Sequence, residues 1–136
     1  MLVELSEEQL VVIPDGQSNN ILWNIGHTIV SLDAFVYGLM KRPLPCGEAM
    51  ASLYLRGTSP ADWTEIPDLQ VVKDTLMSNI DAVQTDFEKG ALADFGPCDL
   101  GFGVTFNTIE DILMFALFHE GMHVQQVNTL HKIVTP

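Results

Sequence analysis

Residues 108–134 read TIEDILMFALFHEGMHVQQVNTLHKIV, and they give the clearest indication of the fold. Apolar side chains recur in it every three or four residues, which is the period of an amphipathic α-helix. Asn107 or Thr108 can cap this helix, and Glu110 and Asp111 in its first turn complement the helix dipole. The predicted core stripe contains Ile112, Ala116, His119, His123, Val127 and Leu130. The sequence thus predicts a long C-terminal helix with two histidines on its buried face.

Two more segments are predicted to be long helices. Residues 19–39 are apolar on two faces, which is typical of a helix buried within a bundle. Residues 67–89 begin with a proline, which suits the first turn of a helix, and are followed by Gly90, which suits its end. The apolar stripe of this segment contains Leu69, Val72, Leu76, Ile80, Val83 and Phe87. No segment shows the alternation of a β-strand, so we expect an all-α fold in one domain of residues 1–136.

The remaining segments are predicted to be turns and loops. Ser6 precedes two glutamates and is expected to cap a short helical turn. Residues 41–67 contain four prolines, which favours a loop with at most one short helix near residues 48–53. Residues 91–106 are rich in Gly, Asp and Phe and are predicted to form a loop.

The composition disfavours several classes of protein. Hydrophobic residues make up 47% of the chain and charged residues 18%, which is the profile of a globular protein. The formal net charge of -12 disfavours nucleic acid and anionic membranes as partners, because both repel an acidic surface. We expect no signal peptide, because the N-terminus lacks the basic and apolar regions of one, and no membrane-spanning segment, because no apolar run has the required length. Cys46 and Cys98 lie far apart and are interpreted as reduced thiols of a cytoplasmic protein.

Three histidines are candidates for one metal site. His119 and His123 are four residues apart, so their side chains leave the same face of the last helix about one turn apart. Both fall on the predicted core stripe, where imidazoles without strong partners are costly to bury. A divalent metal ion removes this cost, because zinc and similar ions bind neutral imidazole nitrogen. His27 is the only histidine in the other buried helix and is the candidate third ligand, whereas His131 is expected to face solvent near the chain end.

The segment His119–His123 also matches the H-E-x-x-H pattern of zinc peptidases, in which Glu120 would be the general base. Such enzymes need a third ligand, often downstream, and no Asp or Glu follows His123. No strand precedes the helix to position a peptide substrate. A metallohydrolase with Glu120 as its catalytic residue is therefore the weaker alternative. Asp33 and Tyr37 follow His27 and are candidates to line a cavity, but helix packing is the preferred role for both.

Four segments carry a resemblance to a known family. They are Leu5–Leu10, Trp23–His27, Leu55–Pro60 and Phe118–His123. Together they resemble the DinB/YfiT-like family, in which one helix carries a Trp, a Gly and a metal-binding His, and another helix carries paired histidines. The resemblance implies a four-helix-bundle-like fold in which His27, His119 and His123 bind a metal ion.

The resemblance also implies a function. Characterised members of the family include metal-dependent transferases of low-molecular-weight thiols such as bacillithiol or mycothiol. We therefore expect a divalent metal ion, zinc or nickel, as the cofactor and a small-molecule thiol or electrophile as the partner. Glu120 or Gln126 is then a candidate to orient a ligand or a histidine. The alternative is a non-catalytic metal- or ligand-binding stress protein with the same site.

The start of the chain departs from the family pattern. The family's first long helix normally precedes the Leu-Ser-Glu-Glu-Gln segment, which begins here at Leu5. Only three long helices are predicted, and the helix at residues 19–39 is apolar almost all round. We expect either a homodimer that covers the exposed apolar groove or additional residues before Met1 in the native protein.

Overall fold

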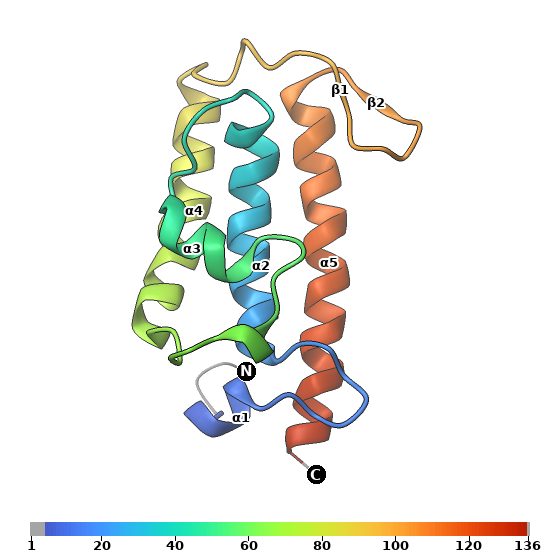
Figure 1. The fold of residues 1–136 in the computed structure, drawn as a ribbon. Helices are drawn as coiled ribbons and strands as arrows, with labels where there is room; N and C mark the ends of the chain where they lie inside the picture. The colour runs from blue at the N-terminus through green and yellow to red at the C-terminus, as the bar shows by residue number, and fades with distance from the viewer. Residues whose placement is uncertain (1–4, 136) are drawn as a thin grey trace.

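Three long helices lie side by side in the computed structural model, which describes residues 5–135 (Figure 1). They are α2 (Ile21–Asp33), α4 (Leu69–Glu88) and α5 (Ile109–Val134). The shorter elements are α1 (Glu7–Val11), α3 (Gly47–Tyr54), a π-helical segment (Ala34–Gly38), a 3₁₀ turn (Pro60–Asp62) and the strands β1 (Cys98–Asp99) and β2 (Thr105–Phe106). The all-α prediction is confirmed, and the three long helices begin and end within about two residues of the predicted limits, apart from the π-helical end of the first.

The helices α1, α2, α4 and α5 each begin where the sequence supplies a capping side chain. Ser6 and Gln9 form a capping box at α1, and Thr108 and Asp111 form a second one at α5. The Asp68 carboxylate accepts hydrogen bonds from two backbone amides at the start of α4. These caps satisfy amide groups that have no partner inside the helix, so the helix starts are set by local sequence.

Asn20 caps α2 and also ties it to the preceding segment. Its side-chain oxygen accepts a hydrogen bond from the Trp23 amide at 2.7 Å, and its side-chain nitrogen donates to the Val11 carbonyl at 2.7 Å. Gln9 in α1 donates to the Val134 carbonyl near the end of α5. The short α1 therefore joins the start of α2 to the end of α5, as Figure 1 shows.

The central helix α2 is covered on most sides, as its two apolar faces predicted. Its buried residues are Ile21, Leu22, Trp23, Asn24, Gly26, His27, Ile29, Val30, Ser31 and Asp33. The helices α3, α4 and α5 all pack against it. The helix then widens into a π-helical turn, in which the Leu39 amide donates to the Ala34 carbonyl at 3.0 Å. Such turns add a residue and rotate the side chains that follow, and here Val36 and Tyr37 become buried.

The Asp33 carboxylate connects the central helix to its neighbours. It is fully buried, and it accepts hydrogen bonds from the Asn79 side chain in α4 at 2.5 Å and from the Cys46 amide at 2.7 Å. Tyr37 donates its hydroxyl to Asp86 of α4 at 2.8 Å. Asp33 and Tyr37 therefore serve helix packing, which was the preferred interpretation, and neither lines the histidine cavity described below.

Two members of the predicted core stripe of α4 do not reach the core. Ile80 is 48% exposed and Phe87 is 41% exposed, which corrects the prediction that the whole stripe is buried. Both face a groove between α4 and α5, which consists of two cavities of about 400 and 300 Å³ that share Ile80 and Glu120 in their walls. We call this the α4–α5 groove. Periodicity identified an apolar face, but no described segment covers this part of it.

The segment after α4 was predicted to be a loop, and it contains one small hairpin. Strand β1 pairs antiparallel with β2, with Cys98 opposite Phe106. Gly101 and Gly103 lie in the connection with positive φ angles of 86° and 70°, which suit glycine. Two residues per strand are too few to show an alternating pattern, so the sequence carried no signal for them. The hairpin stands beside the start of α5 (Figure 1).

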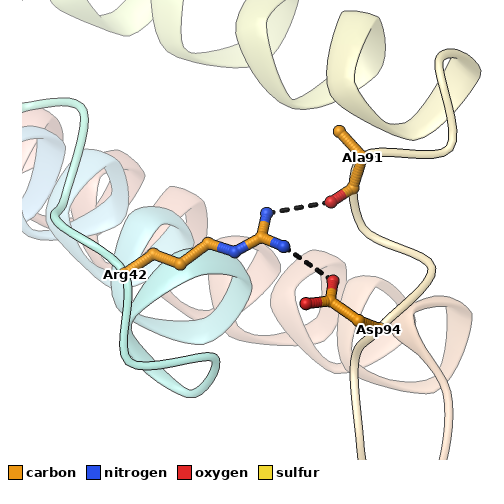
Figure 2. A network of polar contacts seen from close by, with 3 residues as sticks. All are labelled: Arg42, Ala91 and Asp94. Atoms are coloured by element: carbon orange, nitrogen blue, oxygen red, sulfur yellow. Dashed lines mark hydrogen bonds and ion pairs between the residues drawn. The ribbon is translucent and has the colours of Figure 1, made fainter.

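Arg42 holds together the two loops at the hairpin end of the bundle (Figure 2). Its guanidinium donates to the Ala91 carbonyl at 2.9 Å and to the Asp94 carboxylate at 2.6 Å. Within residues 5–135 this is the single ion pair, and it joins the loop after α2 to the turn after α4. None of the helices in this range has both the length and the apolar character that a bilayer crossing requires.

Candidate metal centre

The three predicted histidines meet where α2 packs on α5. One ring nitrogen from each of His27, His119 and His123 lies within 4.8 Å of the other two. The ring centroids of His119 and His123 are 4.6 Å apart, and those of His27 and His123 are 4.7 Å apart. The spacing of four along α5 brings two rings together, and helix packing supplies the third.

Aromatic and backbone neighbours fix the ring of His27. Trp23, one turn earlier on α2, stacks on it with centroids 4.6 Å apart and planes 10° apart. The Tyr54 carbonyl lies 2.7 Å from Nδ1, so it accepts the Nδ1–H of one tautomer. This leaves the lone pair of Nε2 free of a proton, and Ser31 can donate its hydroxyl to it at 3.2 Å.

Gly26 is needed for this arrangement. A Cβ atom at position 26 would overlap the Tyr54 ring, which is fully buried. Glycine therefore lets the end of α3 approach α2 closely enough for the Tyr54 carbonyl to reach His27. The close approach explains a glycine immediately before the histidine in the Trp23–His27 segment.

The two histidines of α5 are held by residues of α2 and of the π-helical turn. Asn24 accepts at its side-chain oxygen from Nδ1 of His123 at 2.8 Å, and its own amide donates to the Asn20 carbonyl. The ring of Phe35 meets His119 edge-on, with centroids 5.3 Å apart. Because Nδ1 of His123 carries the proton in the hydrogen bond to Asn24, Nε2 of the neutral ring is left with a free lone pair.

The surroundings favour neutral imidazoles. Burial lowers the pKa of His27, although the Tyr54 carbonyl opposes this shift. Burial also lowers the pKa of His119, and the charge that His27 would carry adds to this effect. Burial and the two neighbouring histidines lower the pKa of His123 to about 4. Three unprotonated imidazoles at neutral pH are the form that binds a metal ion.

This donor set could hold one divalent metal ion. Neutral imidazole nitrogen is a preferred ligand of zinc and its neighbours, and three imidazoles on one ion lie roughly 3–4 Å apart. The three nitrogens here lie within 4.8 Å of one another, so small side-chain shifts would bring them to that separation. The Tyr54 carbonyl oxygen orients His27 through Nδ1, and the Asn24 side-chain oxygen orients His123 through Nδ1. Metal-binding histidines usually have such a partner on one ring nitrogen. In residues 5–135 no carboxylate or thiol belongs to the cluster.

The other candidate residues lie elsewhere. Glu120 is in the α4–α5 groove, where burial raises its pKa, and His123 lines the same cavity. Gln126 donates its side-chain amide to Gln17 at 2.8 Å rather than to a histidine. His131 contacts Thr135 on its own helix and lies outside the cluster. Burial raises the pKa of Cys46 to about 12, so this thiol is not an activated nucleophile.

Sequence reasoning missed the residues that orient the histidines. Asn20, Asn24, His27 and Ser31 recur at spacings of four, three and four, which places a polar line along the buried helix α2. This pattern was visible in the sequence and could have identified Asn24. The Tyr54 carbonyl carried no such signal, because any residue supplies a backbone oxygen.

Comparison with known proteins agrees with the geometry. The family model of the DinB superfamily matches residues 1–127, which is nearly the whole chain and includes all three histidines. No curated protein matches the sequence. The resemblance noted from the four sequence segments is thereby confirmed. The chain belongs to the DinB superfamily.

Proposed function

We propose that the protein is a metal-dependent transferase that joins a low-molecular-weight thiol to an electrophile, with one zinc or nickel ion held by His27, His119 and His123. The observation that carries this proposal is the convergence of three neutral imidazole nitrogens within 4.8 Å. Three protein ligands leave positions open for a substrate. A bound cation would supply a Lewis acid that lowers the pKa of a thiol, so that the thiol reacts as a thiolate near neutral pH.

Residues of the chain would orient the imidazoles and provide the cavity for a substrate. Trp23 and Phe35 restrict two of the imidazole rings, and Asn24 and the Tyr54 carbonyl orient the donor atoms. A cavity of about 440 Å³ adjoins the cluster and is lined by His27 and His119. In the transfer, the thiol sulfur forms a bond to the electrophilic carbon, the leaving group departs with its electron pair, and the thiol proton passes to solvent.

A metal titration tests the ligand set. The full chain, freed of any tag and stripped with a chelator, is reloaded with Zn²⁺ or Ni²⁺, dialysed and analysed for metal. We expect about one equivalent in the original protein and less than roughly a tenth of that after His27→Ala, His119→Ala or His123→Ala, because two imidazoles bind weakly. His131→Ala is the matched control and should retain the metal. Full occupancy in the His27→Ala protein would show that the ligand set is wrong.

A rate measurement separates the transferase from the alternatives. Metal-loaded and metal-free protein are each mixed with several cellular thiols and a chromogenic aryl halide. We expect at least a roughly 100-fold faster thiol-dependent reaction with metal for one thiol of the panel, a contribution typical of metal-ion activation of a nucleophile. Equal rates with and without metal across the panel would overturn the transferase.

The second candidate is a metal-binding protein without catalytic activity. It is favoured by the composition of the histidine cluster, which in residues 5–135 includes no carboxylate or thiol that could act as an acid, base or nucleophile. A metallohydrolase would need the Glu120 carboxylate beside the metal as a base, and Glu120 lies in the α4–α5 groove instead. Stoichiometric metal binding without any metal-dependent rate would therefore support the binding role.

A further inference from the structure

The cavity beside the histidine cluster has features that the metal site does not explain. Its volume of about 440 Å³ is within the range of small-molecule sites. Its floor is formed by His27 and His119, and its walls include three phenylalanines, at positions 35, 102 and 115. The rings of Phe35 and Phe102 lie 5.3 and 5.6 Å from the ring of Phe115. This places an apolar, ring-lined space directly over two of the three histidines.

Part of this apolar wall is open to solvent. Phe102, in the turn between β1 and β2, is 59% exposed, and Leu55, which also lines the cavity, is 41% exposed. Exposed apolar side chains that face a concave space gain stability when an apolar group covers them. The wall therefore suits a ligand with an apolar body rather than a sugar or a free phosphate.

Arg56 is the only charged side chain in the lining of this cavity. It has no hydrogen bond or ion pair in residues 5–135, unlike Arg42, whose charge is neutralised by Asp94 (Figure 2). The chain has a net charge of -12 and only six Lys and Arg residues, so cations are scarce on its surface. The α4–α5 groove is the opposite case, because Glu120 lines both of its cavities.

The backbone that carries Arg56 is anchored next to His27. Arg56 lies in a turn in which the Thr58 amide donates to the Leu55 carbonyl at 3.0 Å and Gly57 has a φ angle of 95°. The Thr58 hydroxyl accepts a hydrogen bond from the Trp23 indole at 3.0 Å. Because Trp23 also stacks on His27, one residue contacts both the Arg56 turn and a histidine that lines the cavity. The turn therefore places the exposed Arg56 side chain at the cavity, where its guanidinium is available to a ligand.

We propose that this cavity binds a small carboxylic acid with an apolar, ring-sized body, whose carboxylate pairs with Arg56 while the body lies among the phenylalanines. A planar guanidinium can bind a carboxylate through two parallel hydrogen bonds. The opposite end of such a ligand reaches the open side of His27 and His119. If this ligand is the electrophilic substrate, which rests on the function proposed above, Arg56 is the residue that selects acids over neutral compounds.

The test uses the metal-free full chain, from which chelator has been removed by dialysis, so that its outcome does not depend on the metal or on catalysis. The probes are 3-phenylpropanoate, the neutral 3-phenylpropanol and acetate, titrated to about 10 mM in 150 mM NaCl and followed by amide NMR shifts. We expect 3-phenylpropanoate to shift residues around Arg56 and Phe102, and to bind at least tenfold more tightly than either of the other probes, because only it has both groups.

Two variants that each remove one positive charge test whether Arg56 is the residue that binds the carboxylate. Arg56→Gln should weaken 3-phenylpropanoate binding at least tenfold and leave 3-phenylpropanol binding unchanged. Lys89→Gln removes an exposed cation at the end of α4, outside the cavity, and should change either affinity less than twofold. The proposal is overturned if the acid and the alcohol bind alike, if the two variants weaken the acid equally, or if no shift occurs at the cavity. Full metal occupancy in the histidine variants would refute the proposed function and leave this result standing.

Discussion

His123 shows how burial prepares a side chain for metal binding. Its pKa falls to about 4 because the ring loses water and lies beside two other imidazoles. In the unfolded chain a histidine titrates near pH 6.5. Between these values the unfolded chain binds more protons than the folded protein, so the free energy of unfolding decreases as the pH falls through this window. Asn24 orients the ring by accepting its Nδ1–H.

We therefore predict that the metal-free protein loses stability between pH 6.5 and pH 4. The contribution of His123 should be about 1–2 kcal/mol, after a discount for a ring that is partly exposed to solvent. Urea denaturation at pH 7.5, 6.5, 5.5 and 4.5 in the presence of a chelator measures it. His123→Gln should flatten this pH dependence, and His131→Gln should leave it unchanged. A free energy of unfolding that stays constant from pH 7.5 to 4.5 would contradict the prediction.

At the scale of elements, the contact between α2 and α3 shapes the site. Gly26 and the buried ring of Tyr54 touch at a distance that leaves no room for a methyl group. The same contact delivers the Tyr54 carbonyl to His27. Helix packing and the orientation of a histidine therefore depend on one residue without a side chain.

Gly26→Ala is predicted to destabilise the protein by about 1–3 kcal/mol, the usual cost of an added carbon in a closely packed core. It should also weaken metal binding, because α3 must move away from His27. Gly121→Ala is the matched control, since Gly121 lies in α5 with open space around it and alanine there should stabilise by about 0.5–1 kcal/mol. Urea denaturation and a metal titration measure both effects. Equal stability of the two variants would show that the Gly26–Tyr54 contact can relax.

At the scale of the whole molecule, the α4–α5 groove is the least covered part of the structure. Leu117 is 62% exposed on one side of it, and Ile80 is 48% exposed on the other. A second copy of the chain over the groove would remove these apolar side chains from water. The exposed groove is therefore the reason to expect a homodimer.

We predict that the chain dimerises through this groove and that salt strengthens the dimer, because each copy carries a net charge of -12 and salt screens their repulsion. Sedimentation velocity at 50 and 500 mM NaCl measures the association. Leu117→Glu should weaken it at least tenfold, since a carboxylate would be buried in an apolar contact. Val71→Glu adds the same charge at an exposed position of α4 outside the groove and should have little effect. A monomer at both salt concentrations would contradict the prediction.

The sequence alone determined the helices and the candidate ligands. Three- and four-residue periodicity, with capping residues such as Thr108 and Asp68, defined the long helices, because these signals act over one or two turns. The spacing of His119 and His123 indicated a shared face for the same local reason. The tertiary structure decided which of these faces are covered and what surrounds the histidines. Asn24 contacts His123, which lies 99 positions later in the sequence, and Ile80 remains exposed. Both outcomes depend on which helices are neighbours in space, and residues nearby in the sequence do not determine this.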